Sequence, residues 1–65
     1  MKIYLNGQDI ETQAETLMVL FQEQKIDSTA IATAVNGDFV PRTAYETTKL
    51  TQGAKVEVLS PMQGG

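Results

Sequence analysis

The residue types that could perform chemistry in this sequence are few, and they narrow the possible activities at once. The chain has no histidine and no cysteine, so it lacks the commonest general base and the best nucleophile among the side chains. Catalytic arrangements that need either residue are excluded, and so is a metal site built from their nitrogen or sulfur atoms. No two carboxylates are placed together for acid–base chemistry. We infer that the chain is not an enzyme by itself, and we expect neither a metal site nor a bound cofactor.

The clearest chemical potential lies in the last six residues, Ser60-Pro61-Met62-Gln63-Gly64-Gly65. Pro61 interrupts the strand pattern before it, and the residues that follow have no charge and no core-facing period. Six extended residues reach about 20 Å, which is enough to enter the cleft of another protein. Two glycines have no side chains to obstruct a narrow channel. We therefore predict a flexible tail over residues 60–65 that presents a carboxylate.

The charge balance indicates which partners to exclude. Eight acidic and five scattered basic residues leave a net charge of −3, whereas nucleic-acid binding depends on clustered Lys and Arg. No apolar run approaches the roughly 20 residues of a membrane span, and the first residues show no signal-peptide pattern. We expect a cytoplasmic protein with no nucleic-acid partner and no membrane partner.

The tail requires a body that positions it, and 65 residues suffice for one small domain. We predict this domain over residues 1–59. Its first element is a hairpin, because Lys2–Asn6 alternates polar and apolar residues and Gln8–Thr12 reads as a return strand. Asn6-Gly7 between them is the strongest short hairpin signal, since both residues tolerate positive φ.

A helix of about ten residues is predicted over Glu15–Lys25. Either Thr16 or, one turn earlier, Thr12 can cap its first turn. Its last residues are good helix formers that strands avoid. The predicted apolar face recurs at helical spacing and consists of Leu17, Leu20 and Phe21, extended by Ile26.

The second half of the chain is predicted to add short strands. They are Ile31–Asn36, Phe39–Val40 and Lys55–Leu59, with turns at Asn36-Gly37-Asp38 and Gln52-Gly53. Residues 42–51 have no clean period and are expected to contain a short helical turn. The small side chains of Ala32 and Ala34 suit a face pressed close to the helix.

The order of a hairpin, a helix and further strands predicts an α+β fold, the ubiquitin-like β-grasp. This fold has a mixed four- to five-stranded sheet with one main helix packed across it. Its first and last strands are neighbours. Because Val56 and Val58 are expected to face the core, Leu59 should lie on the outer face together with Tyr4. We interpret Tyr4 and Leu59 as a possible docking surface, the alternative being two scattered surface hydrophobes.

Several segments together resemble a known family, the sulfur carrier proteins of thiamin biosynthesis, or ThiS family. The resemblance covers nearly the whole chain and is carried by Lys2-Ile3-Tyr4-Leu5-Asn6-Gly7, Ala34–Arg42, Leu50-Thr51-Gln52-Gly53, Val56-Glu57-Val58 and Gly64-Gly65. One departure is Ala54, where the family commonly has an acidic residue after the glycine; it concerns a turn.

This resemblance implies a mechanism. A partner adenylating enzyme of the ThiF type would use ATP to convert the Gly65 carboxylate into an acyl-adenylate, with Gly64, Gln63 and Met62 threading its active site. A sulfur donor, of the cysteine-desulfurase type or another, would replace AMP and leave a thiocarboxylate. The sulfur would then pass to thiazole synthase. ATP would thus be used by the partner and not held by this chain.

Three other functions remain open from the sequence. The small subunit of molybdopterin synthase shares the fold, the Gly-Gly end and the activation chemistry, although the short Ala34–Arg42 segment favours the thiamin branch. A ubiquitin-like modifier would use the same activated carboxylate to form isopeptide bonds. A plain β-grasp interaction domain would carry Gly64-Gly65 incidentally.

Overall fold

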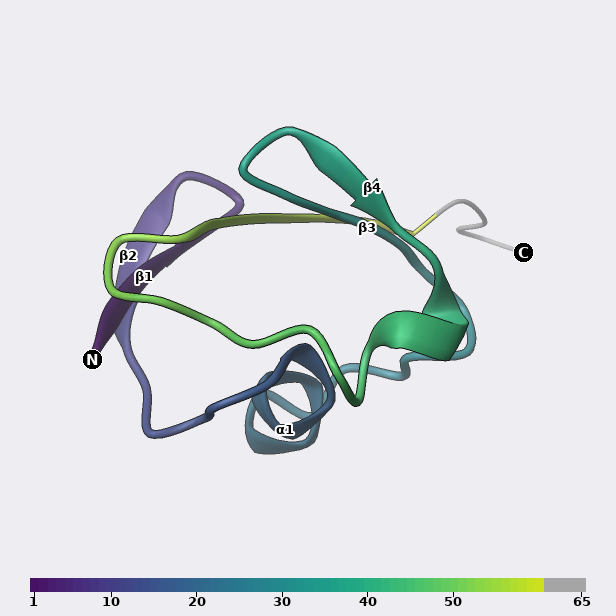
Figure 1. Cartoon of the computed structure of the whole chain (residues 1–65), viewed down its shortest axis with the longest axis horizontal. Helices are drawn as coiled ribbons and strands as arrows, with labels where there is room; N and C mark the ends of the chain where they lie inside the picture. The colour runs from purple at the N-terminus through teal and green to yellow at the C-terminus, as the bar shows by residue number, and fades with distance from the viewer. Residues whose placement is uncertain (61–65) are drawn as a thin grey trace.

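The computed structural model describes residues 1–60, which form a mixed five-stranded sheet with one α-helix across one face (Figure 1). The elements are β1 (Lys2–Leu5), β2 (Gln8–Glu11), α1 (Leu17–Glu23), β3 (Ala32–Val35), β4 (Asp38–Val40), the 3-10 helix η1 (Arg42–Ala44) and β5 (Lys55–Leu59). The strand order is β2-β1-β5-β3-β4. Strand β5 runs parallel to β1, while the other neighbours are antiparallel. The predicted β-grasp and the adjacency of its first and last strands are confirmed.

Both hairpins turn through an Asn-Gly pair. Asn6 and Gly7 have φ angles of 51° and 84°, and Asn36 and Gly37 have φ angles of 52° and 87°. Positive φ at both central residues is the requirement of a type I′ turn, whose twist matches that of the flanking strands. Each pair therefore closes an antiparallel ladder with no extra loop residue.

The N-terminal end of α1 is capped by Thr16, as one of the two alternatives predicted. Its hydroxyl oxygen accepts a hydrogen bond from the third helical amide at 3.3 Å. The amides of Leu17 and Met18 donate to the carbonyl oxygens of Thr48 and Tyr45, both at 3.1 Å. The segment after η1 thus satisfies helix donors that would otherwise lack partners.

Thr12, the other predicted cap, does not cap α1. It forms hydrogen bonds with a residue before the helix and with a residue in its last turn. Its hydroxyl donates to the Glu23 carboxylate in the last turn of α1 and accepts from the Ala14 amide at 3.0 Å. Because Thr12 is buried, these bonds fix the segment between β2 and α1.

The helix is shorter than the ten residues predicted, because it ends at Glu23. Lys25 has a φ of 60°, which is the left-handed conformation that terminates many helices. Its amide donates to the Gln22 carbonyl at 3.3 Å, and the Ile26 amide donates to the Phe21 carbonyl at 2.8 Å. This is a Schellman motif. Ile26 then packs against the core, as expected.

The core lies between the sheet and α1. It contains Ile3, Ala14, Leu17, Leu20, Phe21, Val40, Tyr45, Leu50, Ala54 and Val56. Phe21 and Tyr45 meet edge to face, with ring centroids 5.1 Å apart and planes at 76°. The Thr33 hydroxyl donates to the Tyr45 phenolic oxygen at 2.9 Å. The segment after η1 therefore contributes a large part of the interior.

One prediction about the sheet faces is wrong. Ala32 is exposed and Ala34 is half-buried, whereas Thr33 between them is buried. Strand β3 thus turns its threonine toward the helix. The reason is the hydroxyl partner that Tyr45 provides, since a buried threonine costs free energy only when its hydrogen bond is unmade.

Candidate functional site

The outer face of the sheet, opposite α1, is formed in its middle by alternate residues of β5. Lys55, Glu57 and Leu59 are exposed, while Val56 is buried and Val58 is half-buried. The expected direction of Leu59 is therefore confirmed: 70% of it is exposed. This alternation follows from the period of two along any strand.

Tyr4 and Leu59 both lie on this outer face, but they are not neighbours. Tyr4 on β1 is opposite Lys55, at the beginning of β5. Leu59 is at the other end of the strand, opposite Ala32 on β3. The side chains of Lys55 and Glu57 lie between them along β5. Whether Tyr4 and Leu59 act in docking stays a prediction.

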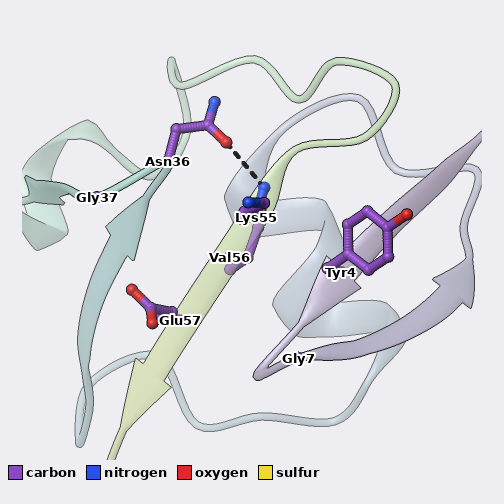
Figure 2. Close-up of a pocket in the computed structure, with 7 residues that line it drawn as sticks. All are labelled: Tyr4, Gly7, Asn36, Gly37, Lys55, Val56 and Glu57. Carbon is purple, nitrogen blue, oxygen red and sulfur yellow. Dashed lines mark hydrogen bonds between the residues drawn. The ribbon is translucent and has the colours of Figure 1, made fainter.

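Tyr4 belongs to a hollow, which we call the Tyr4 hollow and define as the surface lined by Tyr4, Gly7, Asn36, Gly37, Lys55, Val56 and Glu57 (Figure 2). Figure 2 shows the tyrosine ring on β1 and the Glu57 carboxylate on β5, with the helix behind the sheet. Its lining includes the Asn36 amide and the charged side chains of Lys55 and Glu57 beside the Tyr4 ring. Glu57 also lines the groove described next, so the two surfaces meet at β5.

Leu59 belongs instead to an apolar groove, lined by Asn6, Gly7, Ala32, Thr33, Ala34, Phe39, Glu57 and Leu59. In the sheet, β3 lies between β5 and β4. Ala32 is paired with Leu59, and Ala34 with Phe39. The small alanine side chains thus form a low floor between two large apolar ones. The outward alanines, which contradict the predicted face, create this groove.

Phe39 is the candidate site residue that the sequence analysis missed. It is 71% exposed, although phenylalanine is among the residues most often buried. Its neighbour Val40 is buried, so strand alternation directs Phe39 outward. A signal was present in the sequence. Phe39 and Val40 are adjacent on one short strand that ends before Pro41, and only one of two adjacent strand residues can face the core. Contiguous exposed apolar groups such as Phe39 and Leu59 mark interaction surfaces more often than single ones do.

The two hairpin asparagines hold β5 from both sides. The Asn36 carboxamide oxygen accepts from the Lys55 amide at 2.9 Å, at the start of the strand (Figure 2). The Asn6 carboxamide oxygen accepts from the Val58 amide at 2.8 Å, near its end. Each turn thus supplies a side-chain acceptor to the central strand in addition to its own backbone geometry.

The charged groups elsewhere on the described surface are mostly solvated. Lys2 and Asp9 form an ion pair at 3.5 Å across β1 and β2. The pKa of Asp27 is held below its ordinary value because the hydroxyl and the amide of Thr29 both donate to its carboxylate. The pKa of Glu11 is lowered by its hydrogen bond and ion pair with the N-terminal ammonium group of Met1.

Within residues 1–60, no three His, Cys, Asp or Glu side chains gather in a group that could hold a metal ion. Over the same residues, no helix is long and apolar enough to cross a membrane. Gly65, which is predicted to be modified, and Met62, Gln63 and Gly64, which are predicted to thread the partner's active site, lie outside the described residues, as does Pro61. The structure therefore describes the surface around Ser60, the residue that directly precedes them in the sequence.

The fold and its outer face define a β-grasp protein of the ubiquitin-like class. The model of the ThiS family matches residues 2–65, so the chain belongs to the ThiS family, the family of small sulfur carriers that the sequence resembles. The match includes Gly64 and Gly65.

Two solved structures agree with this assignment. A crystal structure of thiamine biosynthesis protein ThiS from Geobacter metallireducens is 28% identical, with all of both chains covered and a TM-score of 0.85. A solution structure of a thiamine biosynthesis protein from the same organism is 25% identical, with a TM-score of 0.80. That comparison covers 100% of this chain and 88% of the other. No curated protein sequence matches the chain significantly.

Proposed function

We propose that this chain carries sulfur for thiamin biosynthesis and that the carried atom is bound to Gly65. The observation that supports the proposal most strongly is the family match over residues 2–65, which includes the two final glycines. The full-length similarity to a thiamine biosynthesis protein supports the same pathway. The chain then acts as a protein substrate, and its partners perform the catalysis in the cytoplasm, where ATP is available.

The reaction begins on the Gly65 carboxylate. In the active site of an adenylating enzyme of the ThiF type, a carboxylate oxygen attacks the α-phosphorus of ATP and pyrophosphate leaves. A sulfur donor, of the cysteine-desulfurase type or another, then replaces AMP at the acyl carbon. The resulting thiocarboxylate is consumed by thiazole synthase. None of these steps needs a histidine or cysteine from this chain, which has neither.

The partner must bind near the end of β5. Residues 61–65 span at most about 17 Å when extended, so an enzyme that acts on Gly65 approaches Ser60 within that distance. The apolar groove begins at Leu59, the residue before Ser60. We therefore place the docking contact in this groove, where Phe39 and Leu59 can bury apolar surface of the partner. Tyr4 is farther along the sheet, and its role is tested separately.

The decisive experiment reconstitutes the reaction and measures the intact mass of the protein. Incubation with ATP, the adenylating enzyme and a sulfur donor should increase the mass by the difference between sulfur and oxygen. Deletion of Gly65 should abolish this increase and leave the domain folded. An unchanged mass with all native partners present would contradict the proposal. Isopeptide bonds to lysines of other proteins would indicate a modifier, and incorporation of the sulfur into molybdopterin in place of the thiazole would indicate the other carrier pathway.

A further inference from the structure

Strand β5 extends past its neighbour β1. The two strands pair only at Tyr4 with Lys55 and at Leu5 with Val56, because β1 ends at Leu5 and the chain then turns through Asn6-Gly7. The other neighbour, β3, accompanies β5 as far as Leu59. The last residues of β5 therefore have a strand on one side and none on the side of β1.

The backbone amide of Val58 faces this side. Along a paired strand, successive residues direct their backbone groups to opposite neighbours. The Lys55 carbonyl accepts from the Asn36 amide on the β3 side, and the Val56 carbonyl accepts from the Asn6 amide on the β1 side, both at 2.8 Å. By this alternation, Val58 also faces β1, where no strand residue continues. The Asn6 carboxamide oxygen accepts its proton at 2.8 Å.

Asn6 is therefore bound to β5 twice. Its amide donates to Val56, and its side chain accepts from Val58. The carboxamide oxygen takes the place that the backbone carbonyl oxygen of Asn6 would have in a longer parallel ladder. It thus secures the part of β5 that directly precedes Leu59 and Ser60.

We propose that Asn6 is a positioning residue for the carrier reaction: its carboxamide holds the end of β5, so that Gly65 is delivered from a fixed point beside the apolar groove. This inference rests on the proposed function. Docking fixes the body of the carrier on the enzyme, but the carboxylate reaches the α-phosphorus of ATP efficiently only when its starting point is also fixed. Loss of the Asn6 carboxamide should therefore slow the bound step more than it weakens binding.

The chain offers a matched control. Asn6→Gly and Asn36→Gly each remove one side-chain hydrogen bond to β5, and glycine retains the positive φ that both turns need. Asn36, however, holds Lys55 at the start of the strand, away from the tail. Asn6→Asp keeps an acceptor oxygen and tolerates the left-handed conformation, so it serves as the conservative rescue.

The first measurement is amide hydrogen exchange by NMR, which needs no partner. Asn6→Gly should accelerate exchange at Val58 by about five- to tenfold, the factor that one hydrogen bond represents, and leave Lys55 unchanged. Asn36→Gly should do the reverse. If Val58 exchanges at the wild-type rate in Asn6→Gly, the carboxamide does not hold the strand and the proposal is wrong.

The second measurement is pyrophosphate release by the adenylating enzyme at varied carrier concentration. Asn6→Gly should lower kcat about three- to tenfold, the pattern of a misplaced reacting group. Because Asn6 also lines the apolar groove, KM can rise as well, but by a smaller factor than the loss in kcat. Asn36→Gly should stay close to wild type, and Asn6→Asp should recover most of the rate. Equal losses in the two glycine variants would overturn the proposal, because they would report general stability alone. Absence of reaction with the wild-type chain would instead refute the proposed function and leave the exchange result standing.

Discussion

Thr33 and Tyr45 share a hydrogen bond inside the core. The threonine hydroxyl donates to the phenolic oxygen at 2.9 Å, and both residues are buried. The bond connects β3, a central part of the sheet, to the segment that follows η1. Because Phe21 of α1 packs edge to face on the same tyrosine ring, Tyr45 contacts both layers of the domain.

Removing one partner of this bond should destabilise the domain. Tyr45→Phe leaves the Thr33 hydroxyl without its acceptor in a buried place, so we expect a loss of about 1–2 kcal/mol in the free energy of unfolding. Thr33→Val should cost a similar amount for the same reason. The double variant should lose clearly less than the sum of the two, because no polar group is then left unpaired. Urea unfolding of the four proteins measures the coupling, and strictly additive losses would mean that the hydrogen bond contributes nothing.

Replacing Lys25 with glycine should stabilise the protein. Lys25, which follows the C-cap of α1, has the left-handed conformation with a φ of 60°, which is strained for residues with a Cβ atom. Lys25→Gly should therefore raise the free energy of unfolding by about 0.5–1 kcal/mol. Gln24→Gly is the matched control, since Gln24 has a φ of −90° and gains nothing from glycine. The melting temperature should rise for the first variant and fall for the second; a decrease in both would contradict this account.

Charge in the apolar groove should weaken docking of the adenylating enzyme. Leu59→Asp and Phe39→Asp each place a carboxylate where apolar surface is expected to be buried, so we expect KM for the carrier to increase at least about tenfold. Val19→Asp is the control, because Val19 is also exposed, at 44%, but lies on α1. Tyr4→Ala tests whether the contact extends into the Tyr4 hollow. Adenylation of Leu59→Asp at the wild-type KM would exclude the groove as the docking site.

The carboxylate of Asp27 should give the protein a pH-dependent share of its stability. Its pKa is lower in the folded state because Thr29 donates two hydrogen bonds to the ionised form. The contribution is therefore complete above about pH 4, the ordinary value of an aspartate, and is lost as the pH falls through the lowered pKa. Wild type should exceed Asp27→Asn in unfolding free energy at pH 7, and the difference should shrink in acid. A difference that stays constant over this range would show that the charge is not involved.

Local features of the fold could be predicted because their causes are local. Asn6-Gly7 and Asn36-Gly37 are both turns, since few residue pairs other than Asn-Gly accept two positive φ angles in succession. The apolar spacing of α1 identified its buried face. The length of α1 was predicted less well, because the Schellman motif that ends it uses a lysine and not the glycine that usually signals such an end.

Features without a local period were missed. Tyr45 lies in a segment with no strand or helix pattern, yet it is among the most buried residues. Its burial depends on Thr33 and Phe21, which come from other elements. The prediction that the β3 alanines face the helix failed for the same reason, because the hydroxyl partner that draws Thr33 inward could not be seen along the strand.

The sequence by itself determined the β-grasp order and the family, because turn signals such as Asn6-Gly7 and the apolar spacing of α1 are contained in single segments. Only the tertiary structure decided which surface lies beside the end of β5, where the tail begins. Phe39 and Leu59 are distant along the chain, yet the β4-β3-β5 register places them diagonally on either side of β3, with Phe39 beside Ala34 and Leu59 beside Ala32. Asn6 reaches Val58 because β1 turns where β5 continues. Strand register sets such neighbours, and register is a property of paired strands that no single segment contains.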